Sequence, residues 1–174
     1  MLITKTGGYV KPAIPVKLPN EGDIMPSDPK LKQLGDAARQ FLSDHGYPEM
    51  AVTYAQYYSG VAVFNLAPVQ QGVVLYPDLV KVWMDITTCA PIGLDARNYL
   101  MFHTFRELPE PAITLEQAQA HVSQRVQVAN SRLVLVPTDD GQELLCYEFS
   151  GTNGEDEYLI HIDAMTGYEQ DILQ

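Results

Sequence analysis

Two stretches of the chain space their apolar residues like the buried face of an amphipathic helix. In the first stretch, apolar residues recur every three or four positions at Leu31, Leu34, Ala38, Phe41 and Leu42. Ser27 or Asp28 can cap this helix, and Gly46 suits its exit. The pattern therefore predicts a helix over residues 29–45.

The second helical stretch begins with a capping sequence. Thr114 and Gln117 have the spacing of a capping box, and Ile113 with Ala118 occupies the positions of a hydrophobic staple. The apolar face then continues through Leu115, Ala118, Val122 and Val126. We expect this helix to cover residues 115–127.

After each helix the apolar period changes to two, which is typical of strands. Segments rich in β-branched and aromatic residues follow the first helix, at residues 50–60, 61–68, 72–77, 79–86 and 90–96. Four more follow the second helix, at residues 131–137, 143–151, 157–164 and 167–173. Each half thus predicts one helix packed on an antiparallel meander, which is an α+β fold of two modules.

The composition limits the classes of partner. The chain has 174 residues, of which 46% are hydrophobic, and a formal net charge of −11. Phosphate backbones and anionic lipid surfaces repel such a chain, so we expect no nucleic-acid partner and no membrane contact by this fragment. No run of about 18 apolar residues appears, and the opening residues lack the apolar centre of a signal peptide.

A turn sequence near the end of the chain recurs. The segment from Ile162 to Gly167 resembles Ile3 to Gly7, and the segment from Met84 to Gly93 occupies the corresponding place in the middle. From Gly7 to the cap Ser27 is 20 residues, and from Gly93 to the cap Thr114 is 21.

The recurrence predicts the organisation of the chain. Residues 1–26 would hold the last strand of a preceding, truncated repeat and a Pro-rich linker, and residues 27–97 a first module. Residues 98–112 would form a connector, and residues 113–174 a second module.

These segments resemble a known family. Residues 113–126, the strands after them and the closing "YLIHIDAMTGYEQDIL" are similar to a PepSY domain, in which a helix precedes an antiparallel sheet that ends in a D-A-x-T-G-like hairpin. The longer series, including "FLSDHGYPEMAVTYAQYYSGVAVFNLAP" and "NYLMFHTFRELPEPAIT", resembles the C-terminal region of the YpeB family of spore germination proteins from Ile3 onward.

The resemblance implies a function. Members of this family are expected to be extracytoplasmic spore proteins at the inner membrane and cortex, anchored by an N-terminal segment that is absent here. The fragment would be a non-enzymatic interaction module that stabilises and restrains the cortex-lytic hydrolase SleB. Two alternatives are a PepSY-type inhibitor of a secreted peptidase and a peptidoglycan-acting hydrolase, which needs a carboxylate pair in a cleft.

Candidate chemical groups are scattered. The four histidines, at positions 45, 103, 121 and 161, form no known catalytic or zinc motif. The acidic segments 139–141 and 153–156 lack the spacing of a calcium loop and favour hairpin turns. We therefore assign no catalytic, cofactor-binding or metal-binding residue, and expect no cofactor.

Both cysteines lie in or beside apolar, strand-like segments. Cys89 and Cys146 form no CxxC pair. Buried free thiols, a disulfide and a reactive nucleophile all stay open as interpretations.

Aromatic residues are the candidates for partner contact. The connector is too apolar for a free linker, so it either packs the modules together or exposes a docking surface. The same alternatives apply to the aromatic residues of the first sheet. The candidate contact residues are Tyr57, Tyr58, Trp83, Tyr99, Phe102, His103, Phe105 and Arg106.

Overall fold

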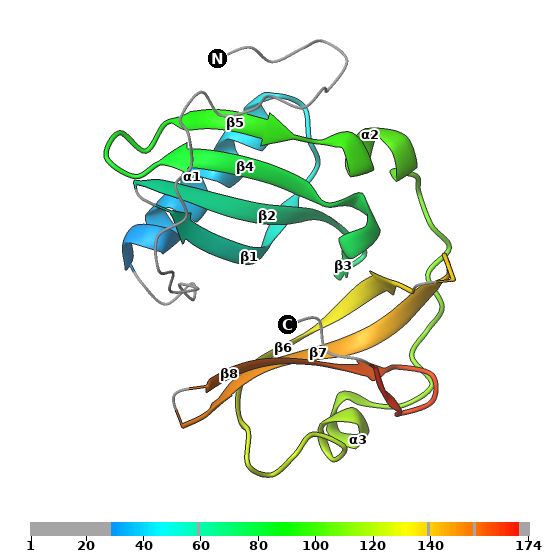
Figure 1. Cartoon of the computed structure of the whole chain (residues 1–174). Helices are drawn as coiled ribbons and strands as arrows, with labels where there is room; N and C mark the ends of the chain where they lie inside the picture. The colour runs from blue at the N-terminus through cyan, green and yellow to red at the C-terminus, as the bar shows by residue number, and fades with distance from the viewer. Residues whose placement is uncertain (1–28, 59, 139, 155, 171–174) are drawn as a thin grey trace. The chain divides into compact units, whose positions relative to one another are not determined.

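The computed structural model describes residues 29–170, except 59, 139 and 155. The chain forms two compact units (Figure 1). The first unit contains Met1–Val69 and Pro77–His103, and the second contains Gln70–Tyr76 and Thr104–Gln174. The short segment 70–76 therefore leaves the first unit and joins the second.

The first unit packs one long helix on an antiparallel sheet. Helix α1 is Pro29–Asp44, which confirms the first predicted helix. The strands pair in the order β1-β2-β4-β5. Their bounds are Met50–Tyr58 for β1, Val61–Gln70 for β2, Val80–Asp85 for β4 and Pro91–Asp95 for β5. The 3-10 turn η1 (Tyr76–Asp78) and the short helix α2 (Arg97–Phe102) complete the elements around this unit.

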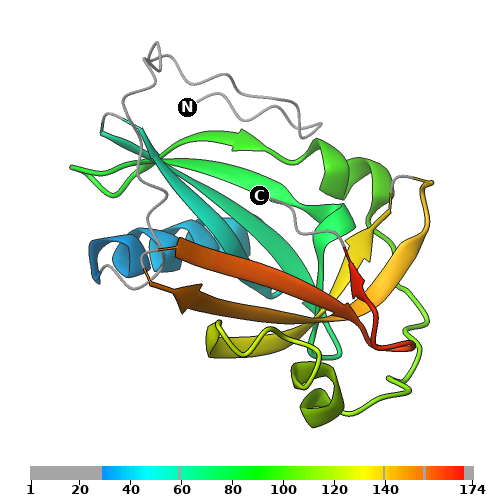
Figure 2. The same cartoon turned by 60° about the horizontal axis from the view of Figure 1, so that its bottom comes forward.

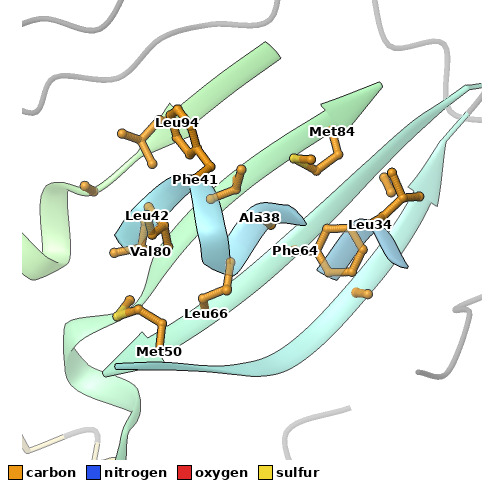
Figure 3. Close-up of a cluster of buried hydrophobic side chains, with 14 of the residues drawn as sticks. Leu34, Ala38, Phe41, Leu42, Met50, Phe64, Leu66, Val80, Met84 and Leu94 are labelled. Atoms are coloured by element: carbon orange, nitrogen blue, oxygen red, sulfur yellow. The ribbon is translucent and has the colours of Figure 1, made fainter. Parts of the chain in front are cut away.

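The predicted apolar stripe of α1 forms one side of the first core. Leu34, Ala38 and Leu42 are fully buried, and Figure 3 shows them facing side chains of the sheet such as Phe64 and Met84. Burying apolar surface on both elements at once is what holds the helix on the sheet.

The second unit has a shorter helix and a mixed sheet. Helix α3 is Leu115–Gln119, and it lies against one face of the sheet (Figures 1 and 2). The strands pair in the order β3-β6-β7-β8-β9. Their bounds are Val73–Leu75 for β3, Gln127–Pro137 for β6, Glu143–Asn153 for β7, Asp156–Asp163 for β8 and Glu169–Gln170 for β9. The predicted α+β class, with helices on mostly antiparallel sheets, is confirmed.

The second predicted helix is too long. The capping box of Thr114 and Gln117 is present, but the helix ends at Gln119 and not at residue 127. Tight turns follow, and one of them is closed by the hydrogen bond that Val122 N donates to Gln119 O. Val122 is still buried and Val126 still packs on the core. The turns therefore bring to the core the same apolar residues whose spacing predicted a helix.

The strand at residues 72–77 forms a pairing that the sequence did not predict. It was predicted as part of the first antiparallel meander, and β3 runs parallel to β6 in the second unit. Its three residues are all apolar and buried, so the local pattern carries no information about which sheet they join.

The two units repeat one register. Each has a bulge in its first strand, between Val52 and Tyr54 in β1 and between Val128 and Asn130 in β6. These matched bulges place the buried rings of Phe64 and Phe149 at equivalent positions.

The repeated turn needs a correction. Cys89 N donates to Asp85 O at 2.9 Å, as Gly167 N does to Asp163 O at 2.9 Å. Cys89 (φ 55°) and Gly167 (φ 78°) both adopt positive φ. Cys89 is therefore the equivalent of Gly167, whereas Gly93, the predicted equivalent, lies in β5. The related segment at residues 3–7 lies outside the described residues.

Candidate functional site

A buried polar cluster spans four segments of the second unit. Tyr76 Oη donates to Glu148 Oε2 at 2.5 Å, and Arg132 Nε donates to Glu148 Oε1 at 2.6 Å. Arg132 also donates to Tyr76 Oη at 3.0 Å, and His161 Nε2 lies 3.0 Å from Glu148 Oε2. Glu148 and His161 are each only 3% exposed. We call these four residues the polar cluster.

Strand register brings the polar cluster together. Arg132 pairs with Glu148, and Glu148 pairs with His161, so one row crosses β6, β7 and β8. Because side chains alternate along a strand, Tyr147 and Phe149 enter the core while Glu148 points to the opposite face. That face is also buried, since Cys146 is 0% exposed.

In the sequence His161 alternates with Ile160 and Ile162, which predicts a polar strand face and not the burial that the structure shows. The available signal was the run from Leu133 to Val136, which is apolar at every position. Such a run is typical of a strand covered on both faces. It would have predicted burial for the polar residues beside it.

Electrostatics hold the carboxylate of Glu148 in its charged form. Burial raises the pKa of Glu148, but the hydrogen bond with His161 and the charge of Arg132 outweigh it, so the net pKa is lowered. Burial and the charge of Glu148 raise the pKa of Tyr76, which keeps its hydroxyl protonated. Burial opposes the charge of Arg132, yet Glu148 and Tyr76 raise its pKa overall.

The hydrogen bonds of the polar cluster favour a role in stabilising the second unit over a role in catalysis. Both carboxylate oxygens of Glu148 already accept hydrogen bonds from protein groups. No buried side-chain N or O atom in the described part of the chain lacks a hydrogen-bond partner. General acid–base catalysis instead requires a proton-transfer group within reach of a substrate.

A second buried carboxylate anchors α2 in the first unit. Asp78 is 0% exposed, and its Oδ2 lies 2.7 Å from His103 Nδ1. The His103 ring stacks on Tyr99, with centroids 4.3 Å apart and an interplanar angle of 15°. Tyr99 also contacts the Tyr47 ring at 4.9 Å. Burial and the nearby Asp78 raise the pKa of Tyr99.

Among the described residues of the first unit, the most exposed large apolar side chains lie on helix α2. Leu100 is 51% exposed, Met101 74% and Phe102 59%. We call these three residues the α2 surface. Consecutive large apolar residues that stay in contact with water are a feature of interaction sites.

The predicted contact residues are distributed over several places. Phe102 belongs to the α2 surface, and Phe105, in the second unit, is 71% exposed. Tyr99 and His103 hold α2 in place, as described above. Leu100 and Met101 were not among the candidate contact residues, although their place beside Phe102 makes three adjacent apolar residues, which was a usable signal.

The other candidates do not form one surface. Arg106 makes a two-point ion pair with Glu143, with both N–O distances 2.8 Å. Tyr57 pairs with Ala62, whose row lies on the α1 face, whereas Trp83 pairs with Val63 on the opposite face. The side chain of Tyr58 lies outside the described residues.

Both cysteines are free thiols, so the disulfide interpretation is wrong for this structure. Cys146 is fully buried, and this burial raises its pKa to about 12, with Asp163 adding to the shift. A thiol with so high a pKa is a poor nucleophile.

The residues described contain no group of three or more His, Cys, Asp or Glu side chains placed to hold a metal ion. Gly141 and Gly154 have φ of 79° and 68°, as expected for turns in the two acidic segments. Among these residues, no helix is long and apolar enough to cross a membrane.

Comparison with known proteins identifies the family. The family model described as "YpeB sporulation, PepSY1 and PepSY2 domains" matches residues 1–109, more than half of the chain. The chain belongs to the YpeB family. A second model, "Peptidase propeptide and YPEB domain", matches residues 112–173 of this YpeB-family chain. The resemblance predicted from the sequence is confirmed.

Individual relatives agree with this assignment. Sporulation protein YpeB of Bacillus subtilis (strain 168) is 31% identical over 99% of this chain and 38% of its own length. Sporulation protein YpeB of Halalkalibacterium halodurans is 30% identical over 98% of this chain and 37% of its own length. The YpeB-family chain therefore spans well under half of these relatives.

A solved structure shares the fold. The structure of the Bacillus megaterium YpeB C-terminal domain is 34% identical, with a TM-score of 0.77. The match covers 90% of this chain and 69% of that one.

Proposed function

We propose that this YpeB-family chain is a non-enzymatic protein-interaction region that binds, stabilises and restrains the spore cortex-lytic hydrolase SleB. The observation that carries the proposal is the α2 surface, an exposed apolar patch on a helix that the hydrogen bond between Asp78 and His103 holds in place. In the whole protein the region is extracytoplasmic in the spore, between the inner membrane and the cortex. A membrane segment N-terminal to this chain anchors it there.

The α2 surface suits a partner contact energetically. Fully burying a Leu, Met or Phe side chain contributes about 1.5–3 kcal/mol each. The Asp78–His103 pair and the stacking of His103 on Tyr99 fix the helix before a partner arrives. A pre-ordered surface loses less conformational entropy on binding, which leaves more of the burial energy for affinity.

The polar groups of the chain favour binding over catalysis. The Glu148 carboxylate is saturated with donors inside the second unit. The Asp78 carboxylate beside His103 is 0% exposed, so a substrate does not reach it in this structure. A peptidoglycan hydrolase would instead need two carboxyl groups facing a sugar across a cleft.

Binding to purified SleB tests the proposal. We expect Met101→Lys and Phe102→Lys to weaken binding at least tenfold, or about 1.4 kcal/mol, in isothermal titration calorimetry. Met165→Lys is the matched control, because Met165 is 44% exposed but lies outside α2. Wild-type binding by both α2 variants would remove the α2 surface from the proposal, and the absence of any complex would refute it entirely.

A second candidate function is inhibition of a secreted peptidase. The family description "Peptidase propeptide and YPEB domain", matched by residues 112–173, favours it. Adding the chain to peptidases secreted by a sporulating culture tests this directly. Inhibition without SleB binding would make this the better assignment.

A further inference from the structure

Strand β3 completes the sheet of the second unit from a distant part of the sequence. Val73, Val74 and Leu75 pair in parallel with Leu133, Val134 and Leu135 of β6. The three β3 residues are 5%, 4% and 0% exposed. Val73 and Leu75 belong to the same core as the α3 residues, so β3 is part of this core and not a surface addition.

The residue after β3 is recognised as specifically as the strand itself. Tyr76 Oη donates to Glu148 and accepts from Arg132. The Tyr76 ring meets the His161 ring edge-on, with centroids 6.2 Å apart. The β6 edge thus binds three apolar side chains, and the polar cluster binds the phenol that follows them.

The first unit has a shorter form of the edge that receives β3. Matching the bulges makes Tyr57 and Tyr58 the equivalents of Leu133 and Val134. The first hairpin turns directly after Tyr58, whereas β6 and β7 stay paired as far as Pro137 and Glu143. Of the residues that receive β3, Leu135 therefore lies in the part of the hairpin that is longer in the second unit.

Sharp turns set β3 apart from its neighbours in sequence. Gln71 and Gly72 have φ of 53° and 81°, and Pro77 follows Tyr76 directly. Gln71 and Gly72 reverse the chain between β2 and β3, and positive φ is uncommon for Gln but suits Gly. The segment from Val73 to Tyr76 is thus a short extended ligand, attached at both ends to the first unit.

We propose that the β6 edge and the polar cluster form a strand-acceptor site that binds Val73–Tyr76 noncovalently. The site takes an extended apolar segment in parallel orientation, followed by a tyrosine. Strand addition of this kind combines backbone pairing with side-chain pockets. The fragment that carries Val73–Tyr76 would then stay bound to the rest of the second unit after the chain is cut.

Cleavage of the folded chain tests the proposal. A protease recognition sequence is inserted between His103 and Thr104, which are both exposed and lie at the boundary of the two units, and the folded protein is cut there. We expect the fragments to elute as one particle in size-exclusion chromatography. If the two fragments eluted separately in the absence of denaturant, the proposal would be overturned.

Substitutions show whether β3 holds the pieces together. We expect Tyr76→Phe and Val74→Ala to raise the dissociation constant of the cut protein at least tenfold. Tyr47→Phe is the matched control, because Tyr47 packs in the first unit against Tyr99. Unchanged dissociation in both test variants would place the attachment elsewhere and refute the acceptor site.

Peptide competition provides a readout that does not depend on a variant folding. A synthetic peptide of residues 70–79 should accelerate separation of the cut wild-type protein, and a scrambled peptide should not. Equal effects of the two peptides would contradict sequence-specific recognition of β3.

Discussion

Replacing Glu148 by Gln tests how much the polar cluster stabilises the second unit. The substitution keeps the shape of the side chain but leaves Arg132 without its charged partner. Removing one partner of a buried ion pair typically costs about 3–5 kcal/mol. The Arg132 side chain is 30% exposed, and water screens part of this loss, so we expect about 2–3 kcal/mol.

The same unit contains a matched control. Glu143 pairs with Arg106 through two N–O contacts of 2.8 Å, but its side chain is 34% exposed. We expect Glu143→Gln to lower the free energy of unfolding by about 0.5–1 kcal/mol, the range of surface pairs. Urea unfolding followed by far-UV circular dichroism measures both variants on one scale.

The pH dependence separates charge from packing. The folded-state pKa of Glu148 is lowered, so its stabilisation is complete above the ordinary Glu pKa of about 4.3 and is lost as the pH falls through the folded-state value. The difference between wild type and Glu148→Gln should therefore shrink as the pH falls below about 4.3. A difference no larger than that of Glu143→Gln at pH 7, or one that does not change with pH, would refute the reasoning.

Three further outcomes follow from the geometry. Gly151→Ala should cost about 1–3 kcal/mol in thermal unfolding, because its new Cβ would lie 2.4 Å from Gln127 O, a backbone atom. Gly167→Ala should lower the free energy of unfolding by about 1 kcal/mol, because φ is 78° at this position. Cys89→Gly should lower it much less, or raise it, because glycine adopts the positive φ of Cys89 without strain. A disulfide exchange reagent at pH 8 should label the half-buried Cys89 first, and should label Cys146 only after denaturation; rapid labelling of both in the native state would contradict this.

Local signals predicted the parts of the fold that depend on neighbouring residues. The apolar stripe from Leu31 to Leu42 predicted α1 to within one residue at its end. Thr114 and Gln117 predicted the start of α3, because a capping box is complete within four residues. The end of α3 was missed, because Val122 reaches the core equally well from a turn.

Long-range features could not be read in the same way. Nothing in Val73–Leu75 distinguishes a strand of the first sheet from one of the second, since the choice depends on an edge sixty residues away. The burial of Glu148 depends on Tyr76, which reaches it from another segment. Candidate contact residues were predicted by type, but their separation onto different faces required the register.

The order in which the chain is synthesised gives β3 a particular place in folding. Val73 is made sixty residues before Leu133, with which it pairs. A nascent first unit can assemble its own core while Val73–Leu75 still lacks the strand that covers it, because domains generally fold from the N-terminal side during synthesis. Docking of β3 then closes the longest loop of the second sheet, and long-range closures of this kind are slow. The apolar segment between β2 and β4 is therefore the point at which an interrupted or stalled chain would aggregate.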